Sequence, residues 1–157
     1  MYGQQGSEVD SALSLYEKPQ ANAYYSTEVV TLFLRAREKI LMLKRADLQT
    51  APLQWCIPGG KVEEGELLVD ALMRELMEEL SWTPLKEKIE YLKELYVHHP
   101  IYKYRLHLFQ CVLDEIPEIQ LNQREHIEYT WIEESEIDTL DLIDGQYEAY
   151  CLTYDKE

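Results

Sequence analysis

The sequence has few cysteines, and their arrangement excludes a disulfide framework. Cys56, Cys111 and Cys151 are isolated from one another and odd in number. A disulfide-stapled secreted domain has an even set at close spacing, and a CxxC zinc site needs paired cysteines. This pattern favours a reducing compartment, so we expect a cytoplasmic protein whose cysteines are small buried hydrophobes.

Long apolar runs and a basic face are also missing. No apolar stretch is long enough to cross a bilayer, and residues 1–23 lack the basic start and apolar core of a secretory signal. The net charge is −15, with 30 acidic residues against 15 basic ones. Proteins that grip polymeric nucleic acid carry a basic surface. We therefore expect neither polymeric nucleic acid nor a membrane as a partner, whereas a small anion remains compatible if a metal ion reverses the local field.

The chain contains one domain's worth of mixed strand and helix signals. Its 157 residues are enough for one core. The predicted strands are 28–34, 39–44, 90–97, 102–113 and 127–132, with a short apolar piece at 55–57, and the predicted helices are 66–80 and one within 133–157. We expect Pro58-Gly59-Gly60 to stop regular structure and 114–125 to be a loop. Residues 1–24 are interpreted as an N-terminal extension and 25–157 as one α/β domain.

The helix predicted at 66–80 has two distinct sides. At 100° per residue, Glu75, Glu78 and Glu79 fall within a sector of about 100°. The apolar residues collect roughly 120° away, and they are Val69, Leu72, Met73, Leu76 and Leu80. The acidic side is compatible with a solvated face, which is common in so acidic a chain. It is equally compatible with a cage of hard oxygen ligands for Mg²⁺ or Mn²⁺, and spacing alone does not decide.

The residues around these glutamates distinguish between the two interpretations, a solvated face and a metal site. Gly60-x5-Glu66-x7-Arg74-Glu75-Leu76-x-Glu78-Glu79 carries six of the seven fixed letters of the Nudix box, and it resembles that family, MutT-like members in particular. The resemblance implies a Nudix fold, an α/β/α sandwich with a mixed β-sheet. The one departure is Ser81, where the family has a glycine that ends the helix in a left-handed turn.

The resemblance also implies roles for individual residues. Glu75, Glu78 and Glu79 would be the catalytic metal ligands for Mg²⁺ (or Mn²⁺), with the carbonyl of Gly59 beside them. Many relatives recruit a further carboxylate from a loop, for which Glu125 is our choice and Glu128 the competitor. The remaining box residues would be structural or face the phosphates, and these are Gly60, Lys61, Glu66 and Arg74. The general base is left open among Glu79, Glu75 and Glu125.

A Nudix hydrolase would cleave a diphosphate bond in a nucleoside diphosphate linked to another moiety. The expected substrate is a small nucleotide, most simply a nucleoside triphosphate that yields monophosphate and pyrophosphate. Alternatives are a non-catalytic sensor, a Nudix-fold isomerase of an isoprenoid diphosphate, whose characteristic Cys setting Cys56 does not resemble, or a hydrolase of dinucleoside polyphosphates, ADP-ribose, sugar nucleotides or RNA caps. A homodimer is also left open. Asp141 or Asp144 is the candidate residue for recognition of the base. The tyrosines 91, 96, 102 and 104 either stack on a base or, more commonly, pack within the sheet.

Overall fold

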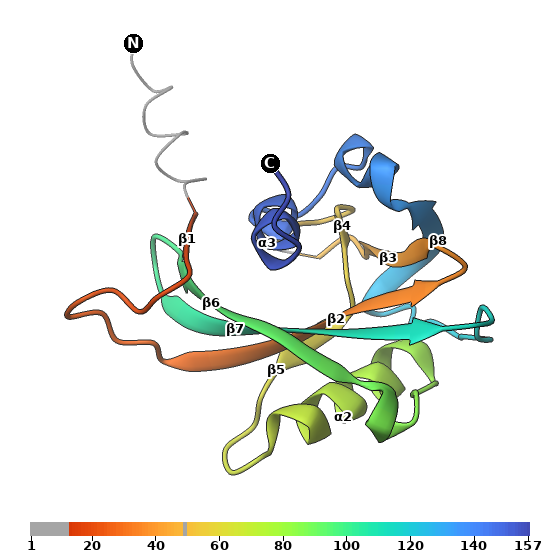
Figure 1. The fold of residues 1–157 in the computed structure, drawn as a ribbon, viewed down its shortest axis with the longest axis horizontal. Coiled ribbons are helices and arrows are strands. Elements are labelled where there is room, and N and C mark those ends of the chain that lie inside the picture. The colour runs from red at the N-terminus through yellow and green to blue at the C-terminus, as the bar shows by residue number, and fades with distance from the viewer. Residues whose placement is uncertain (1–12, 49) are drawn as a thin grey trace.

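The structure, a computed structural model, describes residues 13–48 and 50–157. In this part of the chain eight strands form one sheet in the order β1-β6-β7-β2-β3-β4, with β5 paired to β2 and β8 paired to β3. Helix α2 covers one face of the sheet and the shorter α3 covers the other (Figure 1). The expected α/β/α sandwich with a mixed sheet is confirmed.

Strand β2 (Thr27–Ala36) is the centre of the sheet. It runs parallel to β7 (Lys103–Leu113) along its whole length and antiparallel to β3 (Lys39–Arg45) at its end. The turn between β2 and β3 consists of Arg37 and Glu38, with φ of 51° and 63°. Positive φ at both central residues is the geometry that suits the twist of a two-residue hairpin. The predicted hairpin is therefore confirmed.

The prediction that Pro58-Gly59-Gly60 stops regular structure is wrong. Gly59–Lys61 forms strand β5, which pairs antiparallel with β2 so that Val30 lies opposite Gly60. Strand β3 pairs with β2 only at Arg35 and Ala36, and β5 occupies the edge of β2 that this leaves. Hydrogen bonds offered by an open strand edge thus outweigh the local tendency of glycine to break structure.

Helix α2 (Leu68–Leu80) starts two residues later than predicted. Its apolar side is buried, with Leu72, Leu76 and Leu80 fully inaccessible, and packs on the face of β2 that carries Val30 and Leu32. Val30 and Leu32 are two positions apart on β2, so their side chains lie on the same face of the strand. The helix is thus fixed lengthwise along β2, with its acidic side displaced toward β5.

The opposite face carries a second core, built on Phe33, Met42 and Leu108. Helix α3 (Gln146–Thr153) buries Ala149 and Tyr150 there. The remaining elements are β1 (Ser14–Tyr16), β4 (Trp55–Cys56), β6 (Glu90–His98), β8 (His126–Glu133) and the 3₁₀ helices Lys86–Lys88 and Glu134–Thr139. Strand β1 lies within the segment interpreted as an extension and pairs with β6. None of the helices in residues 13–48 and 50–157 is long and apolar enough to span a membrane.

The end of α2 is stabilised less well than a glycine would allow. Ser81 adopts the left-handed conformation, with φ 54° and ψ 35°, and its backbone N–H donates to the carbonyl of Met77. The turn that the family makes with glycine is therefore kept. We expect Ser81→Gly to raise the free energy of unfolding by about 0.5–1 kcal/mol, because the left-handed conformation strains a residue with a Cβ. Urea unfolding measures this. Ser135→Gly, at an exposed site outside that conformation, is the control and should not stabilise.

Candidate active site

Helix α2 places two carboxylates against the glycines of β5. The backbone N–H of Gly59 donates to Oε1 of Glu79 at 3.1 Å, and Glu79 is only 4% exposed. A Cβ built on Gly60 would overlap the carboxylate of Glu75, so that side chain lies directly over the strand. The two glycines therefore admit both carboxylates to a space that any side chain at Gly60 would fill.

Glu125 joins this pair from the loop before β8. Nδ2 of Asn122 donates to Oε2 of Glu125 at 3.0 Å, and the backbone N–H of Asn122 donates to the carbonyl of Glu79 at 3.2 Å. The loop is thus tied to the last turn of α2 through Asn122. Glu128, the competing candidate, lies on β8, with its Oε1 4.0 Å from Nζ of Lys44.

Glu75, Glu79 and Glu125 line one cleft of about 330 Å³ together with Gly59, Gly60 and Thr31. Glu78 is not among the residues that line it; its side chain is half-exposed, with Oε1 3.5 Å from Nη1 of Arg74. Lys61 is exposed on β5. The structure therefore brings three of the four predicted carboxylates into the cleft, and Glu78 lies outside its lining, next to Arg74 and Glu75.

The shared cleft raises the pKa values of its carboxyl groups. Burial raises the pKa of Glu75 to about 7, and the negative charges of Glu78 and Glu125 add to this while Arg74 opposes it. Burial likewise raises the pKa of Glu79 well above its usual value; the Gly59 N–H opposes the rise, and the charge of Glu75 adds to it. The fold therefore holds several carboxylates close together, with Arg74 at 3.4 Å from Glu75 and Arg45 in the lining of the cleft as the positive charges beside them.

Arg74 and Glu66 form the pair that the box predicts. Nε of Arg74 lies 2.9 Å from Oε2 of Glu66, and Nη2 lies 3.0 Å from Oε1, which is a bidentate arrangement. This pair lowers the pKa of Glu66 to about 2. Nη2 of Arg74 also donates to the carbonyl of Lys61 at 2.9 Å. The loop between β5 and α2 is thereby fastened to both elements.

Two residues of the site were missed at the level of sequence. Asn122 positions Glu125, and its place three residues before that acid was a local signal. Gln146 lines the cleft at its far wall, where its Oε1 accepts a hydrogen bond from the backbone N–H of Ile57 at 3.1 Å. Nothing in the sequence linked Gln146 to the box, because only the packing of α3 on the sheet brings it there.

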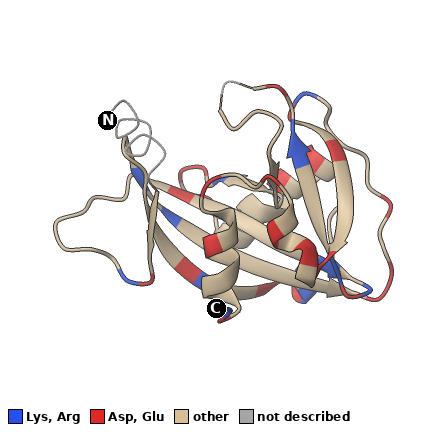
Figure 2. Ribbon diagram, turned by 90° about the horizontal axis from the view of Figure 1, so that it is seen from above, with Lys and Arg blue, Asp and Glu red and all other residues tan. Residues whose placement is uncertain are grey.

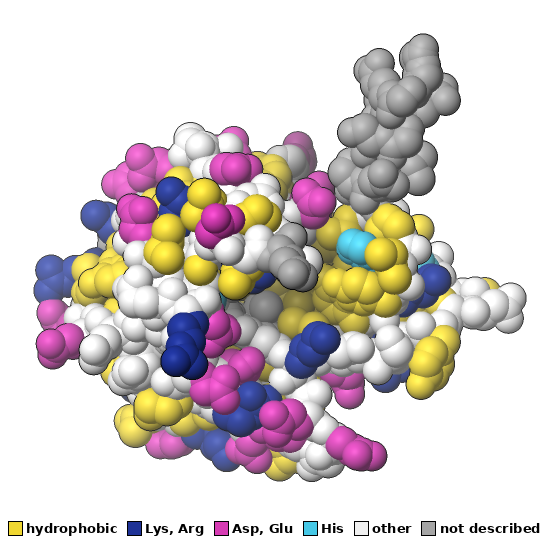
Figure 3. Space-filling view, turned by 180° about the vertical axis from the view of Figure 1, so that it is seen from behind, with side chains coloured by type: hydrophobic (Ala, Val, Ile, Leu, Met, Phe, Trp, Pro, Cys, Tyr) yellow, Lys and Arg dark blue, Asp and Glu magenta, His cyan; other side chains and the backbone are white. Residues whose placement is uncertain are grey.

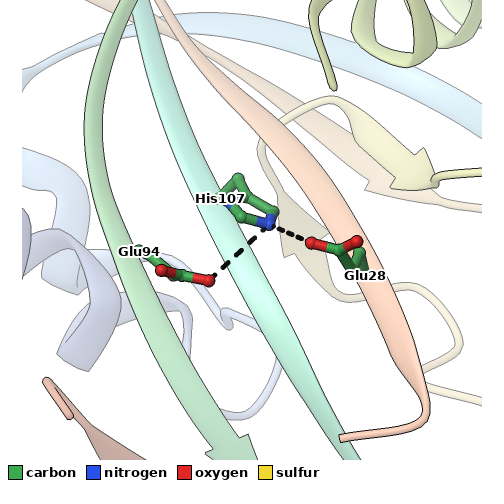
Figure 4. A group of neighbouring side chains, drawn as sticks. All are labelled: Glu28, Glu94 and His107. Atoms are coloured by element: carbon green, nitrogen blue, oxygen red, sulfur yellow. Dashed lines mark hydrogen bonds and ion pairs between the residues drawn. The ribbon is translucent and has the colours of Figure 1, made fainter. Parts of the chain in front are cut away.

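A second group of polar side chains lies on the α2 face of the sheet, one from each of three neighbouring strands. Nε2 of His107 is 2.8 Å from Glu28 and 4.0 Å from Glu94 (Figure 4). The three side chains are close enough to share a cation. Nδ1 of His107 is also engaged, at 2.9 Å from the hydroxyl of Tyr91. Both ring nitrogens thus have partners, and hydrogen bonding accounts for the arrangement.

The aromatic and acidic residues singled out in the sequence have separate positions. Tyr91 packs edge-on against Phe109, which is the packing within the sheet that the sequence offered as an alternative to stacking on a base. Tyr104 and Asp144 line a different, largely apolar cavity next to the cleft. Asp141 instead accepts a hydrogen bond from Nε2 of Gln54 at 3.0 Å.

Lysine and arginine are interspersed with the more numerous acidic residues over the described part of the chain (Figure 2). No continuous basic stripe crosses this view of the molecule.

Comparison with known proteins gives consistent similarities. A model of the NUDIX domain matches residues 25–152. The chain is 46% identical over 52 residues to the m7GpppN-mRNA hydrolase NUDT17 of Danio rerio, which covers 32% of this chain and 17% of that protein. It is 36% identical over 58 residues to the "Putative 8-oxo-dGTP diphosphatase" of Bacillus subtilis (strain 168), covering 37% of this chain and 36% of that protein. Each match thus spans well under two thirds of the curated relative.

The fold has close counterparts among solved structures. The MutT protein from Methanosarcina mazei Go1 superposes with a TM-score of 0.70 at 22% identity, over 87% of this chain and 96% of that one. This likeness shows the shared fold. Since the family model matches most of the sequence, including the box and the loop that carries Glu125, this chain belongs to the Nudix family.

Proposed function

We propose that this chain is a metal-dependent hydrolase that cleaves a diphosphate bond in a nucleoside diphosphate linked to another moiety. The substrate we favour is a nucleoside triphosphate, which gives the monophosphate and pyrophosphate. The observation that carries the proposal is the convergence of Glu75, Glu79 and Glu125 on the glycine strand inside one cleft. The similarity to the Bacillus subtilis diphosphatase supports the substrate class. Residues 25–157 would form the hydrolase domain.

The cleft fits a divalent cation. Mg²⁺ and Mn²⁺ prefer carboxylate and carbonyl oxygens, which are the donors present here. The raised pKa of Glu75 reflects burial and repulsion that a cation would relieve. We propose that Glu75, Glu79 and Glu125 hold the metal, with the Gly59 carbonyl and Glu78 at the edge completing the set. The metal would screen phosphate charge and lower the pKa of a bound water.

The other residues of the box position these ligands. The Gly59 N–H fixes one oxygen of Glu79, and Asn122 fixes one oxygen of Glu125, so within residues 13–48 and 50–157 each carboxylate has a second oxygen without a hydrogen-bond donor. The bidentate Arg74–Glu66 pair holds the loop that precedes α2. Lys61, exposed on β5 beside the cleft, is proposed to meet the phosphates. Such preorganised charges supply most of the rate in phosphoryl transfer.

Turnover of a substrate panel tests the proposal. Purified protein is given ordinary and oxidised nucleoside triphosphates, dinucleoside polyphosphates, ADP-ribose, sugar nucleotides and a capped RNA, with Mg²⁺, with Mn²⁺ and with EDTA. We expect pyrophosphate release from a nucleoside triphosphate that needs metal and is reduced in Glu78→Gln. If folded protein binds metal and nucleotide but releases no product from any member of the panel, the chain is a sensor. Product release from capped RNA alone would show that the substrate is a capped RNA and not a nucleoside triphosphate.

The two glycines of β5 give a pair of variants that separate folding from function. A Cβ at Gly59 would overlap the backbone carbonyl of Val30 and lie 2.8 Å from Cα of Thr31. The three atoms nearest to a Cβ at Gly60 all belong to the carboxylate end of the Glu75 side chain, which can move aside. We expect Gly59→Ala to destabilise the protein by about 2 kcal/mol or more, because backbone must shift. We expect Gly60→Ala to change stability little and reduce kcat/KM about a hundredfold by displacing Glu75.

Thermal unfolding and steady-state kinetics measure the two effects. An equal loss of stability in both variants would show that the Glu75 carboxylate does not lie over Gly60 in solution. Normal activity in Gly60→Ala would show that the position of Glu75 is unimportant.

A further inference from the structure

An apolar cavity of about 110 Å³ adjoins the acidic cleft. The cavity and the cleft share Val29, Thr31, Ile143 and Gln146, so they form one continuous depression. Figure 3 shows a hollow on this side of the molecule, with a wall of hydrophobic side chains next to it. An enclosed apolar cavity of about 150 Å³ accepts a benzene molecule. The apolar cavity is therefore of the size of one ring, and it is too small for a whole nucleotide.

One wall of the apolar cavity comes from the N-terminal segment. Leu13 and Leu15 line it, and β1 is held there by antiparallel pairing with β6, in which Leu15 lies opposite Val97. A Cβ built on Gly145 would lie 3.4 Å from the Cδ1 atoms of both leucines, so these side chains reach the start of α3. The NUDIX domain match begins only at residue 25. The wall formed by Leu13 and Leu15 therefore comes from a segment outside the region that the family model matches.

Gln146 supplies the polar group at the junction of the two spaces. It is 8% exposed, and its Oε1 is committed to the backbone N–H of Ile57. That bond orients the amide, so that the NH₂ group is the end left to donate to a ligand. Among the described hydrogen bonds none uses Nε2 of Gln146, and the residue borders both the cleft and the cavity. A side-chain donor that borders both spaces favours a ligand that has an acceptor on its edge.

We propose that β1 closes the apolar cavity around the non-phosphate end of the substrate, and that Leu13 and Leu15 limit that end to a planar uncharged ring with an acceptor edge, as in a nucleobase. This inference rests on the proposed function, because the cleft is taken to hold the phosphates. Apart from Asp144, Gln146 and the Tyr104 hydroxyl, the walls are mainly apolar, so a hydrated sugar would leave most of its hydroxyl groups without partners. The segment before the matched region is thereby part of the specificity of the site.

The matched variants are Leu15→Trp and Ser14→Trp. Leu15 faces the cavity, whereas Ser14 is its exposed neighbour on the opposite side of the same strand. The indole of Leu15→Trp would fill the cavity. We expect the KM of Leu15→Trp for the best nucleoside triphosphate to rise at least tenfold with kcat nearly unchanged. Hydrolysis of inorganic triphosphate, which has no ring, should stay within about twofold, and Ser14→Trp should behave as wild type.

A second measurement does not depend on turnover. Adenosine, guanosine, cytidine and uridine are titrated into ¹⁵N-labelled protein without metal, and the amide signals of Gly145 and the Gln146 side chain are followed by NMR. We expect one or more nucleosides to shift these signals in wild type and Ser14→Trp but not in Leu15→Trp. If this holds while no substrate is hydrolysed, the proposed function fails and the cavity inference stands. Wild-type nucleoside binding that persists in Leu15→Trp, or is absent altogether, overturns the inference.

Discussion

Replacement of Glu79 by Gln is expected to reduce kcat/KM on the order of a thousandfold and to leave the protein folded. Removal of one preorganised charge from such a site costs about 10²–10³ in rate, and loss of a metal ligand adds to that. The amide of Gln keeps a carbonyl oxygen for the Gly59 N–H, so the 3.1 Å hydrogen bond to the strand survives. Steady-state kinetics at saturating Mg²⁺, with circular dichroism as the check on folding, measures the effect.

Glu64→Gln is the matched control for this substitution. Glu64 is exposed in the loop before α2 and does not line the cleft. Glu64→Gln therefore makes the same substitution and removes the same charge, but outside the candidate site. We expect its kcat/KM within about twofold of wild type. If Glu79→Gln and Glu64→Gln lose activity alike, overall charge rather than the cleft governs the reaction, and the assignment of Glu79 fails.

The second large effect is a pH-dependent instability that metal removes. Glu75 has a pKa raised from 4.5 to about 7 in the folded protein, and burial also raises the pKa of Glu79 well above its usual value. Between the unfolded-state pKa of 4.5 and the folded-state pKa of about 7 for Glu75, the folded protein binds more protons than the unfolded chain. The free energy of unfolding therefore falls as pH rises through this range. We therefore expect the Glu75→Gln, Glu79→Gln double variant to unfold at a higher temperature than metal-free wild type at pH 8. The difference should shrink toward pH 5, where the two carboxyl groups are protonated.

Comparison of the two proteins at each pH isolates this effect from other titrating groups. Burial lowers the pKa of His126 to about 4, which makes stability rise with pH, and Glu66 contributes stability only above its own low pKa. Both groups are present in both proteins and cancel in the difference. Mg²⁺ or Mn²⁺ should raise the melting temperature of wild type strongly at pH 8, weakly at pH 5, and not at all in the double variant. A wild-type protein that is as stable as the double variant at pH 8 without metal contradicts the raised pKa values.

The sequence predicted well whatever depends on local pattern. Helix α2 carries an uninterrupted apolar stripe, and most strands were found within one or two residues, because periods of 3.6 and 2 are visible in the letters themselves. Strand β5 was missed because two glycines carry no strand signal of their own. Its structure comes from the open edge of β2, which is a property of the assembled sheet.

The same distinction holds for the site. Glu75 and Glu79 follow from the box, since both lie on one helix whose orientation the apolar side fixes. The box places Glu78 with them, yet the rotation of α2 leaves it half-exposed beside Arg74. Gln146 and the wall formed by Leu15 could not be predicted, because each reaches the depression through packing with a distant segment. Contacts of this kind have no fixed spacing in the sequence.

The parallel pairing of β2 with β7 sets the order in which the molecule can fold. Thr27 lies opposite Tyr104 and Ala36 opposite Leu113, so the whole Nudix box lies in the loop that this pairing closes. Pairs between such distant segments gain contacts only after the entropy of loop closure has been overcome, which makes folding slow. Strand β5 needs the edge of β2, and α2 needs the face that β2 and β7 share. We therefore expect the carboxylates to converge only after β2 and β7 have paired, and a bound metal ion to slow unfolding more than it speeds folding.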